Sequence, residues 1–455
     1  MHIDFLLDVF SKNRKEEAII WKGEHFDYEW LLDRINYWKN EIQKEHITVG
    51  TVVVLEADFS PTTLALLLGL IDAGCIIVPL TSSVELQKSE FIKIAEGEVI
   101  FKVDRNDHLE ISKTSCQPTH ALISQLKETG NPGLVLFSSG STGKSKASLS
   151  NFSDILNKFK VRRHSLRTIA FLLFDHIGGI NTLLYTLSNA GTVIVVNDRT
   201  PKNVLEAVEK YQVELLPTSP TFINLILLSE AYKNFNLLSL KTVTYGTEPM
   251  PESTLKRFHQ LFPEIQLKQT YGLSELGILS SKSKKSDSLW VKIGGEGFET
   301  RVVDGLLEIK AKSAMLGYLN APNPFTEDGW FKTGDSVLMD GEYVKILGRQ
   351  SEIINVGGEK VYPTEVESVI QEMANVAEVT VFGKKNAITG SMVCAKVLLE
   401  QKDNSKEFSI ALKKFCRKRL QAFKVPVKIE IVEQKQHSKR FKKIKRQLKV
   451  MEYYF

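Results

Sequence analysis

The sequence predicts an α/β fold with a large N-terminal domain and a small α+β domain at its C-terminal end. Two observations support this prediction. Short apolar runs alternate with amphipathic helical stretches through most of the chain, which is typical of mostly parallel sheets covered by helices. After about residue 347 the pattern changes, and the remaining segment has the length of a small separate domain. We therefore expect domains at residues 1–348 and 349–455.

The elements of the larger domain follow from the spacing of its apolar residues. Buried strands are predicted where Val, Leu and Ile form nearly unbroken runs, at residues 52–55, 134–137 and 192–196. Helices are predicted where apolar residues recur every three or four positions, at residues 203–211 and 251–262.

The most apolar stretch, residues 64–80, is too short and too interrupted to cross a membrane, because Asp72 and Gly74 lie within it. We expect a buried helix at residues 64–73, a glycine turn, and a buried strand at residues 75–78. The N-terminus lacks the basic start and apolar run of a signal peptide. These features predict a cytoplasmic protein without a membrane span.

In the small domain, Thr364 follows Pro363 and stands three residues before Glu367, which is the pattern of a capping box at a helix start. An apolar stripe at residues 408–416 predicts a second helix. Strands are predicted at residues 379–381, 393–399 and 429–432. The chain then ends in a basic stretch at residues 435–449.

The composition is that of an ordinary globular chain. Of 455 residues, 43% are hydrophobic and 25% are charged, which excludes a disordered or fibrous protein. The net charge of +5 does not require nucleic acid as a partner, and the basic C-terminal stretch carries no nucleic-acid reading motif. The four cysteines have no zinc or redox spacing and suit a reducing compartment.

A loop rich in Ser, Thr, Gly and Lys follows the strand at residues 134–137. Such a loop suits a polyphosphate, because glycines allow the backbone N–H groups to surround an anion and hydroxyls add donors. Its candidate nucleotide-binding residues are Ser138, Ser139, Gly140, Ser141, Thr142, Gly143, Lys144 and Lys146. The end of the loop also fits a Walker A P-loop, although Ser138 stands where that motif needs its first glycine. A P-loop kinase or ATPase and a plain surface loop are therefore open alternatives at this point.

Further motifs occur in order along the chain. They lie at residues 73–80, 174–179, 246–250, 271–275, 329–335 and 348–367. Together with the loop at residues 138–146, they resemble the adenylate-forming superfamily of acyl-CoA synthetases, peptide-synthetase adenylation domains and luciferases. Two loop residues depart from that signature: Ser145 stands where proline is usual, and Ala147 where glycine is usual.

The resemblance implies a fold and an activity. It implies two parallel-type sheets and a small β-barrel in the larger domain, with the small domain acting as a mobile lid. It implies an enzyme that uses ATP and Mg²⁺ to convert a carboxylic acid to acyl-AMP, releasing pyrophosphate, and then transfers the acyl group to CoA. The alternatives are transfer to the phosphopantetheine of an acyl carrier protein, and a non-catalytic protein on the same fold.

The resemblance also implies roles for particular side chains. Glu275 is the expected Mg²⁺ ligand, because a hard cation prefers carboxylate oxygen. Asp335 is expected to accept hydrogen bonds from the ribose hydroxyls, with Arg349 nearby, and Tyr271 is expected at the adenine. Further expected ATP contacts are Gly246, Thr247, Glu248, Gly272 and Ser274.

The segment around His176 has two readings. The His-x-Gly-Gly spacing of residues 176–179 resembles acyl-CoA ligases, which places His176 near the acyl carboxylate and favours CoA as acceptor. A structural role for His176 is an equal alternative. Asp175 offers a rival, because amino-acid-activating relatives use an aspartate in this segment to bind the substrate amine.

The C-terminal tail departs most from the family. In the family, the tail usually contains Gly-Lys-Ile/Val-x-Arg after a Pro-Arg-Thr-like turn. That turn is absent here. Matching Ile444 and Arg446 to the family's Ile and Arg makes Lys443 the candidate for the lysine between carboxylate and α-phosphate, with Lys442 in the glycine's position. A solvated basic tail is the alternative. The resemblance also implies a hinge at Ser351 and a thiol-arm loop at Gly357-Gly358.

Overall fold

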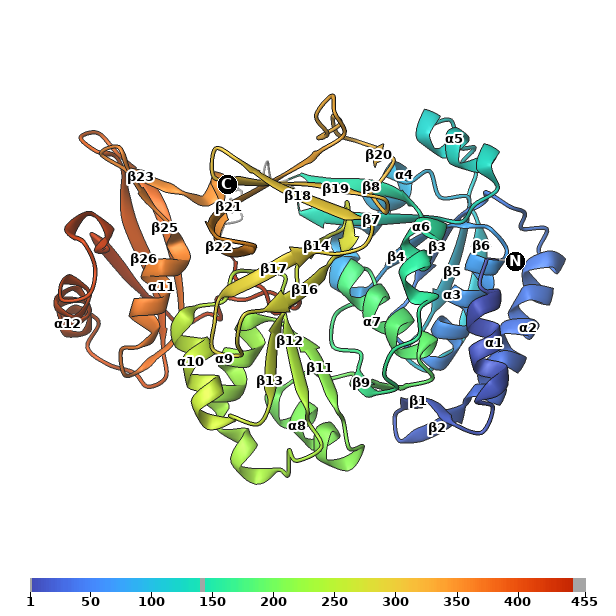
Figure 1. The fold of residues 1–455 in the computed structure, drawn as a ribbon, viewed down its shortest axis with the longest axis horizontal. Helices are drawn as coiled ribbons and strands as arrows, with labels where there is room; N and C mark the ends of the chain where they lie inside the picture. The colour runs from blue at the N-terminus through green and yellow to red at the C-terminus, as the bar shows by residue number, and fades with distance from the viewer. Residues whose placement is uncertain (1, 140–143, 445–455) are drawn as a thin grey trace, which may run out of the picture.

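The computed structural model describes residues 2–139 and 144–444. A large N-terminal part contains three main sheets and their helices, and a small C-terminal part lies at the left of Figure 1 in orange and red. Strand β22 (Tyr343–Arg349) leads through a short 3₁₀ turn, Gln350–Glu352, into β23 (Ile354–Val356), the first strand of the small part. The domain boundary expected from the sequence, between residues 348 and 349, falls one residue before the end of β22.

The first sheet has seven strands and a parallel centre. Its order is β20 (Gly317–Tyr318), β8 (Ser145–Asn151), β7 (Gly133–Ser139), β4 (Ile76–Leu80), β3 (Val52–Glu56), β5 (Val99–Val103) and β6 (Leu109–Lys113). Strands β7, β4, β3 and β5 are parallel, whereas β20, β8 and β6 are antiparallel to their neighbours. The predicted apolar helix is α3 (Pro61–Asp72), which is buried on all sides and packs against α2 (Tyr28–Lys44).

The second sheet also has seven strands. Its order is β13 (Gln266–Gln269), β12 (Thr242–Tyr245), β11 (Leu215–Thr218), β9 (Arg167–Ile169), β10 (Thr192–Val195), β1 (Glu17–Trp21) and β2 (Glu24–Asp27), with only the last pair antiparallel. Its helices include α7 (Ile177–Ser188), α8 (Pro201–Lys210), α9 (Pro220–Ser229) and α10 (Glu252–Leu261). Helices α8 and α9 each begin with a hydroxyl N-cap, Thr200 or Ser219, followed by proline.

The third sheet is antiparallel and lies between the other sheets and the small domain (Figure 1). Its order is β16 (Ser280–Ser283), β17 (Trp290–Gly294), β22, β21 (Phe331–Asp340), β19 (Leu306–Ala311) and β18 (Phe298–Val303). This sheet corresponds to the expected small β-barrel. Its two end strands, β16 and β18, are not paired with each other, so the sheet is open.

The small domain packs two helices on a mixed sheet. The sheet contains β24 (Glu359–Val361), β23, β26 (Gly390–Leu399), β25 (Val376–Asn386) and β27 (Lys428–Val432). Helices α11 (Pro363–Gln371) and α12 (Ser405–Arg417) bury their apolar faces against it. The predicted α/β fold with a small α+β domain is thus confirmed, with sheets that mix parallel and antiparallel strands.

The predicted helices and strands are present with ends shifted by a few residues, but the capping box is wrong. Helix α11 begins at Pro363 with Tyr362 as its N-cap, so Thr364 already lies inside the first turn. Proline favours the first helical position because its missing N–H needs no partner there. Glu367 instead accepts a hydrogen bond from the Val381 N–H at 2.9 Å. No helix in the described part of the chain has the length and apolarity needed to span a bilayer.

Candidate active site

The predicted phosphate loop joins two antiparallel strands. Strands β7 and β8 pair so that Ser138 lies opposite Lys146 and Ser139 opposite Ser145. Four predicted loop residues lie outside the described residues: Gly140, Ser141, Thr142 and Gly143. A Walker A loop runs from a strand into a helix, whereas this loop runs into β8. The topology therefore argues against the P-loop alternative.

Glu275 is buried next to the end of β7. Its Oε1 accepts hydrogen bonds from the Tyr318 hydroxyl at 2.7 Å and from Ser138 Oγ at 3.4 Å. Lys146 Nζ lies 5.0 Å from the centre of the Tyr318 ring, and Lys144 is exposed. The described residues contain no cluster of three His, Cys, Asp or Glu side chains able to bind a metal. A single buried carboxylate such as that of Glu275 suits an ion such as Mg²⁺, which takes waters and nucleotide phosphates as its other ligands.

Asp335 and Arg349 face each other across β21 and β22. Arg349 Nε lies 3.0 Å from Asp335 Oδ1, and the Tyr271 hydroxyl donates to Asp335 Oδ2 at 2.5 Å. Burial raises the pKa of Asp335 above its ordinary value. Burial, followed by the charge of Asp335, raises the pKa of Tyr271. The structure thus brings together three residues predicted at the nucleoside, with the carboxylate already oriented by two donors.

The turn before α7 explains the His-x-Gly-Gly spacing. His176 is the N-cap of α7, and its Nδ1 accepts a hydrogen bond from the Gly178 N–H at 3.0 Å. A Cβ on Gly179 would lie 2.0 Å from the Leu173 carbonyl oxygen, so no larger residue fits there. Burial, then the charges of Lys442 and Arg440, hold the pKa of His176 well below its usual value. The imidazole is therefore neutral, and its proton lies on Nε2 because Nδ1 is an acceptor.

The Lys442 ammonium reaches this imidazole. Lys442 Nζ lies 3.4 Å from His176 Nε2. Burial, then the charge of Arg440, lowers the pKa of Lys442 to about 8. A cavity beside the two side chains is lined by Phe171, Leu172, Leu173, His176, Arg199, Thr247, Arg440 and Lys442. Two N–H donors therefore converge on one small space.

Lys443 points the other way. Its Nζ lies 2.7 Å from Glu367 Oε2 on α11, and its backbone N–H donates to Glu248 Oε2 at 3.0 Å. Phe441 has a left-handed backbone, with φ of 51°. Glycine is the residue best suited to that conformation. Phe441 therefore has a backbone conformation that suits the glycine of a Gly-Lys pair, and the residue that follows it is Lys442.

Arg440 and Arg199 are charged pocket residues that sequence reasoning missed. Arg440 Nη2 lies 2.7 Å from Asp175 Oδ2, which also accepts from the Thr81 hydroxyl at 2.8 Å. Arg199 Nη1 donates to the Phe171 carbonyl at 2.8 Å. Because Arg440 neutralises Asp175 here, the geometry gives little support to an amine-binding role for Asp175. Neither arginine belongs to a recognisable motif, so no sequence signal pointed to them.

The predicted adenine-side residues lie at the ends of two strands. Glu248 Oε1 accepts a hydrogen bond from the Thr221 N–H at 2.9 Å, and Oε2 accepts one from the Lys443 N–H. Both carboxylate oxygens therefore bind backbone N–H groups of the protein in this structure. Thr247 is exposed and lines the cavity. Gly246 and Gly272 both lie where a Cβ would contact neighbouring backbone oxygens within 3.0 Å. Ser274 is half-buried one residue before Glu275.

The structure does not bring the predicted thiol-arm loop to this site. Gly357 and Gly358 form an exposed turn between β23 and β24, with φ of 61° and 92°. Strand β23 lies at the top of the small domain in Figure 1. The proposed hinge residue Ser351 is exposed in the turn that links the two domains. The tail, not the glycine loop, occupies the domain junction in this arrangement.

Comparison with known families gives matches in both parts of the chain. The model of the AMP-binding enzyme family matches residues 8–309, and that of the AMP-binding enzyme C-terminal domain matches residues 365–442. The chain belongs to the AMP-binding enzyme family. Its fold and two-part organisation are those of adenylate-forming enzymes.

Several curated relatives of this AMP-binding protein are CoA ligases. The 2-succinylbenzoate–CoA ligase of Listeria monocytogenes is 25% identical over 92% of this chain and 93% of that protein. Acyl-CoA synthetase 7 of Caenorhabditis elegans is 30% identical over 65% of this chain and 61% of that protein. The match to the indoleacetate–CoA ligase of Aromatoleum aromaticum, at 27% identity, spans 59% of this chain and 57% of that ligase.

Solved structures show the same fold. The anthranilate CoA ligase AuaEII in complex with anthranoyl-AMP superimposes with a TM-score of 0.82 at 18% identity, covering 95% of this chain and 93% of that one. The o-succinylbenzoate CoA synthetase from Bacillus subtilis has a TM-score of 0.76 at 18% identity, covering 98% and 97%. At this identity the likeness concerns the fold alone.

Proposed function

We propose that this protein is an ATP-dependent acid–thiol ligase that forms acyl-AMP from a carboxylic acid and transfers the acyl group to CoA. The proposal is supported by the family, by relatives whose names describe CoA ligases, and by the geometry at the domain junction. The use of ATP and CoA supports a cytoplasmic location.

One observation carries the proposal. The Nε2–H of His176 and the ammonium of Lys442 face each other at 3.4 Å. Two donors cannot satisfy one another, and neither nitrogen is hydrogen-bonded to an acceptor oxygen within the described residues. A carboxylate or phosphate oxygen between them would accept from both, and charge-assisted hydrogen bonds of this kind are the strong ones. The pair is therefore suited to hold the oxygen anions that must meet during adenylation.

The first half-reaction then proceeds by positioning and charge neutralisation. A carboxylate oxygen forms a bond to the α-phosphorus while the bond from that phosphorus to the bridging oxygen of pyrophosphate breaks, and the electron pair leaves with pyrophosphate. Lys442 neutralises the approaching anions, and His176 orients one oxygen. Asp335 holds the ribose hydroxyls, and Glu275 would hold Mg²⁺, which supplies charge neutralisation at the phosphates when bound.

In the second half-reaction a thiol sulfur attacks the acyl carbon, and the bond from that carbon to the AMP oxygen breaks. The thiol proton leaves to solvent and AMP departs. This step needs no lysine between carboxylate and phosphate, so the tail must withdraw to admit the thiol. We propose Lys442, rather than the sequence-based candidate Lys443, for the adenylation role, because the Lys443 ammonium is paired with Glu367.

Pyrophosphate release across a panel of fatty, aryl and amino acids tests the proposal. We expect AMP and pyrophosphate only with Mg²⁺-ATP and a suitable acid, and a thioester when CoA is added. ADP formation, or no turnover with any acid, would contradict it. If a phosphopantetheinylated carrier protein accepts the acyl group and CoA does not, the acceptor assignment is wrong.

A further inference from the structure

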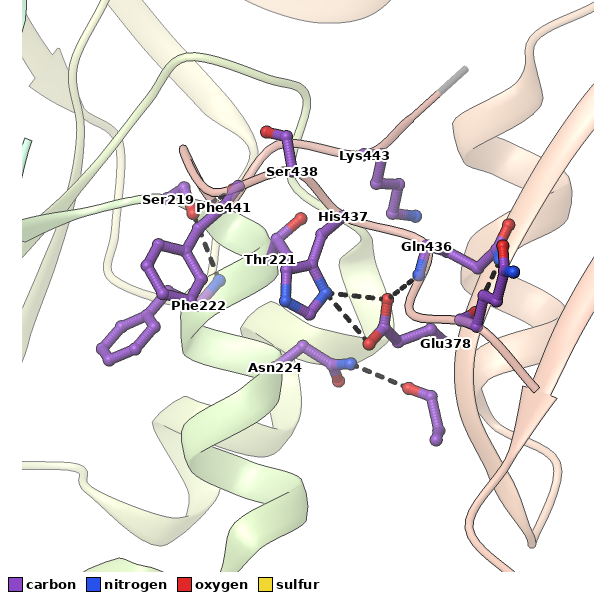
Figure 2. Close-up of polar contacts among 12 residues, drawn as sticks. Ser219, Thr221, Phe222, Asn224, Glu378, Gln436, His437, Ser438, Phe441 and Lys443 are labelled. Atoms are coloured by element: carbon purple, nitrogen blue, oxygen red, sulfur yellow. Dashed lines mark hydrogen bonds and ion pairs between the residues drawn. The ribbon is translucent and has the colours of Figure 1, made fainter. Parts of the chain in front are cut away.

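The chain around Lys442 forms a short hairpin at the junction of the two domains. Ser438 N–H donates to the Lys442 carbonyl at 2.9 Å, and Ile444 N–H donates to the Gln436 carbonyl at 2.8 Å. We call residues 436–444 the tail hairpin. Its turn inserts into the N-terminal domain, while its two ends lie against the small domain (Figure 2).

Two side-chain contacts join the ends of the tail hairpin to the small domain: His437 with Glu378, and Lys443 with Glu367. His437 Nδ1 lies 3.0 and 2.9 Å from the two carboxylate oxygens of Glu378 on β25, and both side chains are nearly buried. Lys443 Nζ lies 2.7 Å from Glu367 Oε2 on α11, whose side chain is 2% exposed. Glu378 also accepts from the Gln436 N–H at 2.8 Å. Both carboxylates belong to the domain expected to rotate, so these contacts travel with it.

The turn of the tail hairpin is anchored in the other domain by Phe441. Its ring lies 5.3 Å from the ring of Phe171 and 5.0 Å from that of Phe222, both buried in the N-terminal core. Its carbonyl accepts a hydrogen bond from Ser219 Oγ, the N-cap of α9, at 2.6 Å. Figure 2 shows Phe441 beside Ser219 and Phe222, on the opposite side of the hairpin from Glu378.

These contacts flank Lys442 on both sides. The Phe441 carbonyl is held by Ser219, and the Lys443 N–H is held by Glu248. With the backbone fixed before and after it, Lys442 directs its side chain to His176, whereas the Lys443 side chain turns back to Glu367.

We propose that Glu367 and Glu378 are positioning residues that present Lys442 for adenylation, with Phe441 as the anchor that docks the hairpin. This rests on the proposed function. The two carboxylates carry the hairpin as one unit with the small domain, so that rotation of that domain withdraws Phe441 and Lys442 together. We call the contacts of Glu378 with His437 and of Glu367 with Lys443 the clamp. Adenylation depends on the clamp. Thioester formation does not, because it needs the hairpin withdrawn.

The test separates the half-reactions in full-length protein carrying Glu367→Gln or Glu378→Gln. Glutamine keeps the shape of the side chain. It can still accept from the Val381 N–H at position 367 and from the Gln436 N–H at position 378, but it removes the negative charge that faces the hairpin. We expect the kcat of acyl-AMP formation to fall about tenfold or more, with the KM for ATP little changed, because fewer molecules hold Lys442 in place. Thioester formation from supplied acyl-AMP and CoA should stay within about twofold.

Glu365→Gln is the matched control, because this carboxylate lies on the same helix but pairs with Lys424, away from the hairpin. Lys443→Met breaks the Lys443–Glu367 pair from the hairpin side and leaves the small-domain core unchanged. If the pair acts as one unit, the double variant with Glu367→Gln should be no worse than either single variant. Equal losses in both half-reactions, or losses as large in Glu365→Gln, would overturn the proposal.

Hydrogen exchange gives a readout that does not depend on activity. Backbone amides of residues 436–444 should exchange about tenfold faster in Glu378→Gln and Glu367→Gln, while the amides of α12 are unchanged. Unchanged exchange in the hairpin would overturn the clamp even if the protein activated no acid. If the hairpin amides exchange faster in the variants as expected, but the wild type forms no acyl-AMP, only the proposed function is contradicted.

Discussion

Lys442 Nζ lies 3.4 Å from His176 Nε2, although 266 residues separate the two in the chain. One residue comes from the C-terminal tail and the other caps the helix that begins at Ile177. The contact joins the two domains at a point where both nitrogens are donors. The first two predictions below depend on this relationship.

Lys442→Ala should abolish most acyl-AMP formation, whereas Lys443→Ala should have a smaller effect. Removing a preorganised charge from a reacting site costs about 10²–10³ in kcat, while Lys443 acts only through the position of the hairpin. Thioester formation from supplied acyl-AMP should survive in both variants. Radiolabelled ATP–pyrophosphate exchange measures the first half-reaction, and a larger loss in Lys443→Ala would restore the original assignment.

Adenylation should weaken in alkaline solution. The pKa of Lys442 is lowered to about 8 by burial and by Arg440, and only the protonated form carries the charge that adenylation uses. The kcat/KM for ATP should therefore fall as pH rises through about 8. Lys442→Arg keeps its charge at every pH in this range, so its residual activity should lack this decline. The same alkaline limb in the arginine variant would assign it to another group.

Asp335→Asn should weaken nucleotide binding. The substitution removes the charge opposite Arg349 and one of the acceptors expected for the ribose, so we expect the KM for ATP to rise by about tenfold or more. Asp340→Asn is the control, because Asp340 is the last residue of the same strand and pairs with exposed Lys284. Titration with a nucleotide analogue measures the affinity, and similar losses in both variants would indicate general damage to β21.

Ser351→Pro should separate the two half-reactions in the opposite sense to the clamp variants. Ser351 lies in the three-residue turn between β22 and β23, where domain rotation needs backbone torsion angles to change. Proline fixes φ near −65°, so acyl-AMP formation should persist while thioester formation falls about tenfold or more. Ser351→Ala is the control. Parallel loss of both rates, with a lower melting temperature, would mean that the turn is merely structural.

The fold and much of the candidate site could be predicted because their signals are local. Apolar periodicity located the strands and helices, and short motifs singled out Glu275, Asp335 and His176. The helix at residues 363–371 was misjudged at its first residue, because Pro363 competes with the apparent capping box that follows it. Local rules of this kind tolerate errors of a residue or two at the ends of elements.

The choice between Lys442 and Lys443 needed the tertiary structure. The two lysines are adjacent and chemically identical, and the sequence offered only their spacing to Ile444 and Arg446 to distinguish them. Which ammonium enters the site depends on the left-handed backbone at Phe441 and on Ser219, Glu248 and Glu367, all distant in sequence. For the phosphate loop, the ordered motifs already favoured an adenylate-forming enzyme over a P-loop protein, and the antiparallel pairing of β7 with β8 adds an independent structural ground.

Sequence alone therefore determined the family, the α/β architecture and the general location of the nucleotide site, because backbone propensities and short motifs act over a few residues. The tertiary structure decided the direction of each tail side chain, the pairing of Asp175 with Arg440, and the contacts of the hairpin with Glu378 and Glu367. Those features depend on long-range packing and on buried charges finding partners, which are set only when segments distant in the chain come together.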